Sequence, residues 1–346
     1  MIGVATAVAV AVAIAAPSML NGYVLYLATL AAVYSVAGLG MTMLLGWTGQ
    51  ISLLQAAFVG LGAYGTDLVF QHWHLPWAIS MLLVAFSLGV AGTALALPAI
   101  RLRGFYLAIA TLALAEAIVY GFVSFTSITG GSNGAYVPEV VLLGLSQTSS
   151  IWYLSIITLV VALVGLGRIQ RGSFGRMLLG VRDAEVAMGP MQVSPVAYKL
   201  AAFAIASLLA SIAGALYAQL VTYITPQSFD LPLLIELLVV VFLGGIDSVA
   251  GPPIGAAFVI GLNELLQKAG TIQPVIFGAV LIIVILFLPR GLASIPERVR
   301  EHRWADRGVG GVIRRLLTLP PRAAEGQQSR DLYPAEPSQG GRRHGQ

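Results

Sequence analysis

The sequence contains no cysteine, and charged residues make up only 10% of its 346 residues. Without cysteine the chain has no disulfide framework, no thiolate ligand for a metal and no cysteine nucleophile. An ordinary soluble domain carries roughly 25% charged residues, which cover its surface. Because 58% of the residues here are hydrophobic, the composition excludes a soluble globular domain and indicates a membrane protein.

Lysine is also scarce, since the chain contains only Lys199 and Lys268. Neither has the neighbours of a phosphate-binding G-x-x-x-x-G-K-[ST] loop, so the chain is not itself a P-loop ATPase. Residues 130–134 match the G-x-S-x-G pattern of hydrolases, but their composition is typical of a flexible loop. His72 and His74 lack a third metal ligand nearby. We therefore expect no enzymatic activity, no cofactor and no metal site.

The sequence contains instead a series of apolar runs near the length that crosses a bilayer. A transmembrane helix needs about 20 mostly apolar residues to cross roughly 30 Å of hydrocarbon. The runs do not alternate between apolar and polar residues, which argues against a transmembrane β-barrel. We expect an all-α, polytopic membrane bundle of about ten transmembrane helices. The expected spans are residues 1–17, 23–46, 51–70, 76–98, 104–126, 151–167, 199–219, 232–245, 252–267 and 273–290.

Two parts of this series carry a further expectation. The first run has no lysine or arginine before it, which predicts a retained first helix, although Ala13-Ile14-Ala15 has the form of a signal-peptide cleavage site. The runs 232–245 and 252–267 are short, and glycines and prolines lie between them. Such residues indicate broken or re-entrant helices, which are tolerated only where protein buries them.

Lysine and arginine gather in three segments of the chain. Arg101 and Arg103 separate the fourth and fifth spans, and five basic residues within 168–199 separate the sixth and seventh. The third segment, 291–346, holds ten arginines against six acids. With ten spans all three segments fall on one side, which the positive-inside rule makes cytoplasmic, together with both termini. The loops expected on the opposite side, 71–75, 127–150 and 220–231, contain no lysine or arginine.

The charge distribution divides the chain into two expected parts, a membrane domain over 1–290 and a basic cytoplasmic tail over 291–346. Residues 305–346 are rich in glycine, proline, glutamine and arginine, so we expect the tail to be largely disordered. Its positive charge suits contact with anionic lipid.

The cytoplasmic segment 168–199 is long for a connection that only reverses the chain, which needs fewer than about six residues. Its apolar residues recur at helical spacing and predict a short amphipathic helix that ends by Pro190. Such a helix suits insertion into a groove on a cytosolic partner. The residues expected to supply burial are Phe174, Met177 and Val181, and those expected to fix the register by ion pairs are Arg182, Asp183 and Glu185.

Four acids, Asp67, Glu116, Glu236 and Glu264, fall within apolar runs. An ionisable group at that depth costs several kcal/mol unless it is paired or faces water, so a functional role is the default interpretation. Glu116 and Glu236 have the longest apolar flanks, and we expect both to line a translocation path. The same acids leave an ion-coupled secondary transporter open as an alternative.

Two weaker patterns concern the packing of helices. Residues 60–65 match G-x-G-x-x-G inside an apolar run, where glycine lets a neighbouring backbone approach closely, so we interpret them as a packing surface rather than a nucleotide site. Residues 45–59 resemble residues 243–259, with Leu-Gly followed by Ala-Ala-Phe-Val in each. Duplicated halves are common in transporters, but alanine-rich helices also match by chance.

Several segments, in order along residues 38–290, resemble one known family. They are GLGMTMLLGWTGQISLLQAAFVGLGAY (38–64), RLRGFYLAIATLALAE (101–116), TGGSNG (129–134), GRMLLGVRDAEVA (175–187), YKLAAFAIA (198–206) and LLVVVFLGGIDSVAGPPIGAAF (237–258). Together they resemble branched-chain amino-acid ABC importer permeases of the LivM type. The resemblance implies a multi-pass permease of the bacterial plasma (inner) membrane that receives branched-chain or other small amino acids from an extracytoplasmic binding protein.

The resemblance also implies a second, homologous permease subunit and two cytosolic ABC ATPases. The ATPase-docking motif of the family falls on Gly175, Arg176, Arg182, Asp183 and Glu185 of this sequence. Within the first resembling segment we expect Gln50, Ser52 and Gln55 to line the translocation path. The family commonly has Gly-His where this chain has Leu54-Gln55, so the related permeases for urea and short amides remain an alternative.

Overall fold

The computed structural model describes residues 17–99, 104–140, 146–184, 194–287 and 291–294. The chain forms two compact units, Met1–Ile295 and Pro296–Gln346, and the second lies entirely outside the described residues. The expected first span, the expected tail and Glu185 therefore have no structural account here. Within the described residues the chain is an all-α membrane bundle, as the composition predicts.

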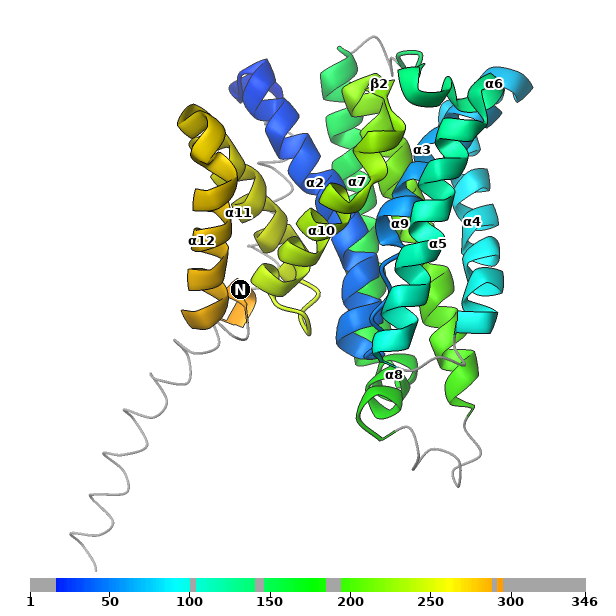
Figure 1. Ribbon diagram of the computed structural model, residues 1–346, viewed down its shortest axis with the longest axis vertical. Helices are drawn as coiled ribbons and strands as arrows, with labels where there is room; N and C mark the ends of the chain where they lie inside the picture. The colour runs from blue at the N-terminus through cyan, green and yellow to red at the C-terminus, as the bar shows by residue number, and fades with distance from the viewer. Residues whose placement is uncertain (1–16, 100–103, 141–145, 185–193, 288–290, 295–346) are drawn as a thin grey trace, which may run out of the picture. The chain divides into compact units, whose positions relative to one another are not determined.

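Ten helices of at least twelve residues make up the described bundle (Figure 1). They are α2 (Gly22–Thr42), α3 (Gln55–Trp73), α4 (Trp77–Ala99), α5 (Phe105–Ser124), α7 (Gln147–Arg171), α8 (Ser173–Ala184), α9 (Pro195–Val221), α10 (Leu231–Gly244), α11 (Gly251–Leu266) and α12 (Gln273–Phe287). The short elements are the π-helix η1 (Met43–Trp47), α6 (Thr126–Thr129), η2 (Gly131–Asn133), β1 (Ala135–Tyr136), β2 (Tyr223–Ile224), η4 (Pro226–Phe229), η5 (Gln267–Ile272) and η6 (Leu292–Ser294).

Six segments of the described bundle are long and apolar enough to cross a membrane. They are Gly22–Trp47, Trp77–Leu97, Phe105–Ser124, Gln147–Arg171, Pro195–Val221 and Pro226–Gly244. Helix α11 is apolar but has only 16 residues, and α12 has 15. The structure therefore supports a polytopic bundle, while the count of ten spans stays a prediction.

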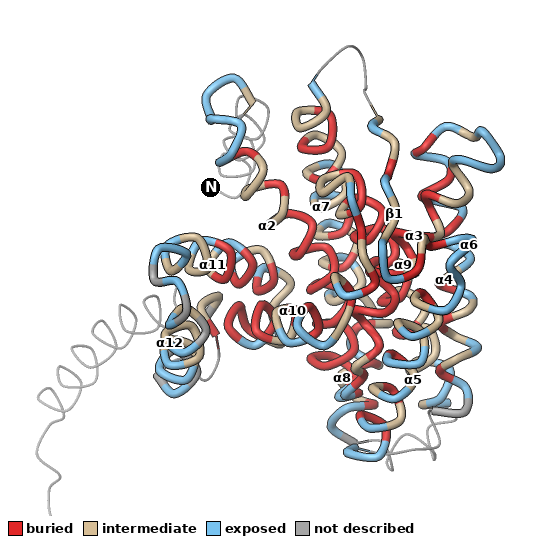
Figure 2. The backbone as a smooth tube through the Cα atoms, turned by 45° about the horizontal axis from the view of Figure 1, so that its top comes forward, coloured by how far each residue is buried: buried red, intermediate tan, exposed pale blue. Residues whose placement is uncertain are grey.

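Helix α9 is the centre of the bundle, with 67% of its most apolar window buried against 33% for α4 and α5. It packs against α2, α3 and α4, and Figure 2 shows the buried backbone concentrated where these helices meet. The peripheral helices carry exposed apolar side chains, such as Phe86 on α4, Tyr106 on α5 and Val161 on α7. Lipid or another membrane subunit has to cover these surfaces, because water would not.

Glycines set the distance between α9 and α3. A Cβ atom added at Gly214 would overlap the backbone of Val59, and one added at Gly62 would overlap Ser211. Such small-residue contacts let two helix backbones approach closely and pack well where no hydrophobic effect drives association. The packing interpretation of residues 60–65 is therefore consistent with the structure, and α3 crosses α9 at these glycines.

The chain between α2 and α3 differs from the expected helix over 51–70. Helix α2 continues as the π-helix η1 to Trp47, residues 48–54 are irregular, and α3 begins only at Gln55. Gln55 donates a hydrogen bond to the carbonyl of Ala37 on α2. Ala37 lies ten residues before Trp47, which is about 15 Å along a helix at 1.5 Å per residue. The irregular segment thus turns back into the bundle before α3 starts.

The expected breaks near 244–253 are present as a turn between α10 and α11. This turn lies against the end of η1, because a Cβ atom at Gly46 would overlap the carbonyl of Ile246. Gly46 and Ile246 belong to the two segments whose sequences resemble each other. The two interruptions of the bundle are therefore neighbours in space.

The opposite end of the bundle carries a small hairpin-like pairing. Strands β1 and β2 pair antiparallel with Ala135 opposite Ile224 and Tyr136 opposite Tyr223. Tyr223 also donates its hydroxyl hydrogen to the carbonyl of Asn133. We call this the hairpin end and the opposite one the α8 end, since α8 lies there (Figure 1).

We predict that Gly214→Ala lowers the stability of the folded protein by roughly 1–3 kcal/mol, because the new methyl group meets rigid backbone on α3. The matched control is Gly165→Ala on α7, where nothing lies within 4 Å of the added Cβ position. The control should unfold at or slightly above the wild-type temperature, since alanine favours a helix over glycine. Thermal unfolding of the purified variants in detergent tests this, and equal midpoints for both variants would contradict the proposed crossing.

Candidate functional site

Helix α8 lies immediately after α7, at a sharp corner that two glycines allow. Gly172 ends α7 by donating its backbone N–H to the carbonyls of Arg168 and Ile169. A Cβ atom added at Gly175 would lie 2.6 Å from the Cα atom of Gln170. Any larger residue at Gly175 would therefore push α8 away from α7, which explains a glycine there in steric terms.

The apolar face of α8 packs on its own chain. Leu178 is fully buried and Val181 is 2% exposed, while the Phe174 ring lies 5.3 Å from the ring of Tyr198 on α9, measured between centroids. Met177 is half-buried. The residues expected to fill a groove on a partner are therefore mostly used inside this chain, and Arg176, Arg182 and Asp183 are the exposed members of the motif.

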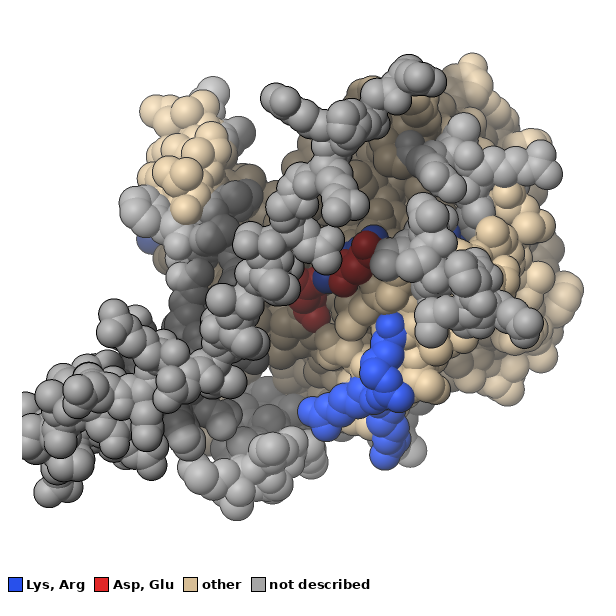
Figure 3. All heavy atoms as spheres, turned by 90° about the horizontal axis from the view of Figure 1, so that it is seen from below, with Lys and Arg blue, Asp and Glu red and all other residues tan. Residues whose placement is uncertain are grey.

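Arg182 connects α8 to both interruptions of the bundle. Its Nη1 donates to the carbonyl of Gly46 at the end of η1 and lies 2.6 Å from Oδ1 of Asp247 in the α10–α11 turn. Its Nε donates to Oδ1 of Asp183 at 2.9 Å. We call this arrangement of Arg182, Gly46 and Asp247 the Arg182 junction. Figure 3, viewed from the α8 end, shows acidic and basic side chains close together and a separate group of basic side chains on the same face.

The junction also fixes the backbone around it. The side-chain stem of Arg182 lies against Gly49, where an added Cβ atom would come within 2.9 Å of Cγ, and Gly49 has a left-handed φ of +68°. Gln170 on α7 donates its Nε2 to the carbonyl of Asp247 at 2.9 Å. The hydrogen bond to Asp183 is the main reason that the pKa of Arg182 is raised above its ordinary value, so the guanidinium is a permanent cation.

Asp247 is the functional candidate that sequence reasoning missed. It lies in an exposed turn, where an acid is ordinary, and nothing in its spacing points to Arg182. The only available signal was its position inside the resembling segment 237–258.

The irregular segment 48–54 contains two of the expected path residues, Gln50 and Ser52, and a third, Gln55, follows it. All three are at most 5% exposed. The backbone of the segment is held by neighbours, since Gln50 donates its N–H to Leu44 and Leu53 donates its N–H to Thr111 on α5. Bilayer hydrocarbon supplies no hydrogen bonds, so irregular backbone inside a bundle needs such protein partners.

Several polar side-chain atoms around this segment lack a partner. Among the described residues, Gln50 Nε2, Ser52 Oγ and Trp47 Nε1 are buried and make no hydrogen bond. Gln55 differs, because its Nε2 donates to the carbonyls of Ala37 and Ala206. Leaving a buried donor unpaired costs about 1–3 kcal/mol, so these atoms point to a site that binds water or a polar solute.

The two acids expected on the path lie apart. Glu116 is exposed on α5 and lines a narrow crevice with Asp230, whereas Glu236 lines a cavity of about 260 Å³ between α2, α10, α11 and η5. Asn263 Nδ2 donates to Oε1 of Glu236 across 3.5 Å. Asp67 on α3 accepts from Gln71, and its Oδ1 has no partner among the described residues. No single site therefore gathers all four acids of the described spans.

Residues 23–289 match the family model described as "branched-chain amino acid transport system / permease component". The chain is 27% identical over 305 residues to the high-affinity branched-chain amino acid transport system permease protein LivM of Salmonella typhimurium, covering 81% of this chain and 72% of that protein. It is 28% identical over 305 residues to the high-affinity branched-chain amino acid transport system permease protein LivM of Escherichia coli, again covering 81% of this chain and 72% of that protein.

A probable branched-chain amino acid transport permease protein LivM of Methanocaldococcus jannaschii is 28% identical over 244 residues, 64% of this chain and 68% of that protein. No solved structure matches the chain significantly. The relatives are transport permease components and not enzymes. With six apolar spans among its described residues, the chain is a multi-pass protein of the bacterial inner membrane that belongs to the family of branched-chain amino acid transport system permease components.

Proposed function

We propose that this chain is the membrane-spanning permease subunit of an ABC importer for branched-chain or other small amino acids. In this proposal an extracytoplasmic binding protein delivers the amino acid, a second homologous permease completes the membrane part, and two cytosolic ATPases supply the energy. The family assignment supports the substrate class, and the absence of a P-loop motif from the sequence supports separate ATPases.

The distribution of basic residues supports a cytoplasmic location for the α8 end. Arg168, Arg171, Arg176 and Arg182 belong to the last turn of α7 and to α8, while the sequence around the hairpin end carries no lysine or arginine over 127–150 and 220–231. We propose ten spans with both termini on the α8 side, and a basic tail over 291–346 that contacts anionic lipid.

The Arg182 junction is the observation that carries the proposed mechanism. Helix α8 is amphipathic, lies at the end of the bundle proposed to be cytoplasmic and presents Arg176 and Asp183 outward, as a docking helix requires. Its Arg182 binds both η1 and the α10–α11 turn. Movement of a docked ATPase would therefore act through α8 on both interruptions of the bundle, and Phe174, Met177 and Val181 would keep α8 attached to the bundle while it moves.

The proposed translocation path contains Gln50, Ser52 and Gln55 and passes the cavity of Glu236. Unpaired buried donors at Gln50 and Ser52 support it, because a polar solute or water would satisfy them. Glu116 is exposed on α5, so it would join the path only where the second permease closes over this face.

Uptake of a labelled branched-chain amino acid into vesicles should require the partner ATPases, internal ATP and the binding protein. Vesicles with this chain and its partner permease alone should show no uptake under a proton or sodium gradient. Gradient-driven uptake by the membrane subunits alone would favour the ion-coupled alternative instead. Parallel assays with leucine and with urea decide between the amino-acid substrate and the amide alternative.

Charge reversals on the outward face of α8 should weaken ATPase binding. Arg176→Glu and Asp183→Arg each replace a pairing charge by a repelling one, which at a protein contact costs a few kcal/mol. Glu139→Arg, on an exposed loop near the hairpin end, is the matched control and should bind the ATPases normally. The measurement is co-purification of the ATPases with each variant, and full retention by both α8 variants would sink the docking proposal.

Arg182→Ala should loosen α8 and uncouple ATP hydrolysis from uptake. The Arg182–Asp247 pair itself contributes little, since its side chains are 32% and 68% exposed, but the charged hydrogen bond to Gly46 is partly buried. We expect amide hydrogen exchange of residues 173–184 to accelerate about tenfold, which corresponds to 1.4 kcal/mol. The control is Arg176→Ala. Within the described part of the chain, the guanidinium of Arg176 donates only to the nearby carbonyl of Arg171, at 3.0 Å, so its loss should leave this exchange near the wild-type rate.

A further inference from the structure

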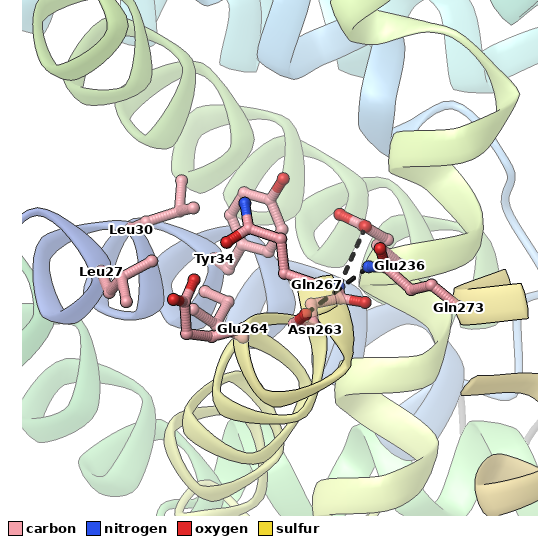
Figure 4. Close-up of a pocket in the computed structure, with 9 residues that line it drawn as sticks. Leu27, Leu30, Tyr34, Glu236, Asn263, Glu264, Gln267 and Gln273 are labelled. Carbon is pink, nitrogen blue, oxygen red and sulfur yellow. Dashed lines mark hydrogen bonds between the residues drawn. The ribbon is translucent and has the colours of Figure 1, made fainter. Parts of the chain in front are cut away.

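The cavity that Glu236 lines is bounded by a second acid. Figure 4 shows Tyr34 from α2, Glu236 from α10 and Glu264 from α11 around one space. Asn263 lies between the acids and donates to Glu236, and the amide of Gln273 donates to the Asn263 carbonyl, each across 3.5 Å. The bond from Asn263 is at the long limit for a hydrogen bond, and Tyr34 also interacts with the carboxylate of Glu236, whose two oxygens still offer further lone pairs to a ligand.

The lining of this cavity is rich in hydrogen-bond acceptors and carries no cation. None of the residues described around it is lysine, arginine or histidine, although two carboxylates face it. A carboxylate within a membrane protein is costly unless a positive charge or water compensates it. The cavity therefore favours a ligand that carries its own positive charge.

The remaining walls indicate what else the ligand carries. Leu27, Leu30 and Ile260 form an apolar side that suits an aliphatic group, and the amides of Asn263 and Gln267 are available to a carboxylate. The volume of about 260 Å³ is below the roughly 300–1,000 Å³ of pockets for drug-sized ligands, so the cavity fits a smaller solute.

The two acids lie at different depths. Glu264 accepts a hydrogen bond of 2.6 Å from Tyr23, which is 53% exposed at the start of α2, whereas Glu236 faces Tyr34, which is 9% exposed. Tyr23 and Tyr34 are separated by about 16 Å along the helix at 1.5 Å per residue. Glu264 thus marks the rim of the cavity towards the hairpin end, and Glu236 marks its interior.

We propose that this cavity is a binding site for an aliphatic amino acid, with the ammonium group held by Glu236 and received first at Glu264. The proposal rests on the proposed import function and adds the residues that hold the substrate. The ammonium group donates hydrogen bonds to the Glu236 carboxylate, the side chain packs on Leu27, Leu30 and Ile260, and the amides of Asn263 and Gln267 donate to the substrate carboxylate.

The test uses the purified complex of this chain with its partner permease and ATPases in lipid nanodiscs, without the binding protein. Thermal unfolding is followed while leucine, 3-methylbutylamine or 4-methylpentanoate is added. The amine lacks the carboxylate of leucine and the acid lacks its ammonium group. Leucine and the amine should stabilise the wild-type complex, and the acid should not. Stabilisation by the acid alone, or by sodium ions as strongly as by leucine, would overturn the proposal.

Glu236→Gln keeps the size of the side chain and removes its charge, so the apparent dissociation constant for leucine should rise at least about tenfold. Glu264→Gln should raise it less, and Glu139→Gln, on an exposed loop outside the cavity, should leave it unchanged. Equal constants for the wild type and Glu236→Gln would contradict the site. The comparison of amine with acid on the wild type decides the question even where a variant fails to assemble.

Uptake by the complete transporter separates the two proposals. If wild-type vesicles with the binding protein and ATP take up no leucine, the import function fails. If they take up leucine, but the amine does not stabilise the complex and Glu236→Gln does not change the dissociation constant for leucine, only the proposed binding site fails.

Discussion

Hydrocarbon offers no hydrogen bonds to a polypeptide, and this constraint governs how the bundle is assembled. The chain abandons helical structure between Trp47 and Gln55, inside the bundle, so neighbouring helices must satisfy its polar groups. Thr111 on α5 accepts the backbone N–H of Leu53, and the Ala206 carbonyl on α9 accepts from the side chain of Gln55, where α3 begins. Gln55 reaches Ala206 only because α9 lies very close to α2 and α3, and Gly62 and Gly214 permit that approach on the α3 side. The glycine crossing and the interrupted helix are thus parts of one arrangement.

The Arg182 junction uses the same interruption in a second way. A helix that stops inside or at the edge of the bundle leaves carbonyl groups without intrahelical partners and a partial negative charge at its end. Gly46 supplies such a carbonyl at the end of η1, and the guanidinium of Arg182 binds it together with Asp247. In a chain with so few charged residues, this junction is a specific link between a surface helix and two internal turns. Because the Arg182–Asp247 ion pair is exposed, it orients α8 against the turn more than it stabilises the folded protein.

Composition and periodicity were sufficient to predict the membrane class, most helix positions and the surface helix at 173–184. They did not reveal which way that helix faces, because an apolar stripe such as Leu178 and Val181 does not show whether its own chain or a partner covers it. Residues 48–50 fall in the expected gap between two spans, but residues 51–54 were expected to be helical, because Ile51, Leu53 and Leu54 look like the start of the next hydrophobic run. Asp247 was invisible for a different reason, because an acid in an exposed turn is ordinary until its distance to Arg182 is known. Gln50 and Ser52 were found through family resemblance, and only the structure shows that their polar atoms are unpaired.

Helices α10 and α11 relate the two proposed sites to each other. They carry Asp247 in the turn at one end, and Glu236 and Glu264 nearer the other. A Cβ atom at Gly255 would overlap the Val240 backbone, so the two helices pack tightly on each other. A displacement of the turn by α8 would then shift both acids relative to Tyr34 on α2. A carboxylate that holds an ammonium group firmly would otherwise retain it, so release requires the geometry around the acids to change. The tight α10–α11 pair provides a physical route by which events at α8 produce that change.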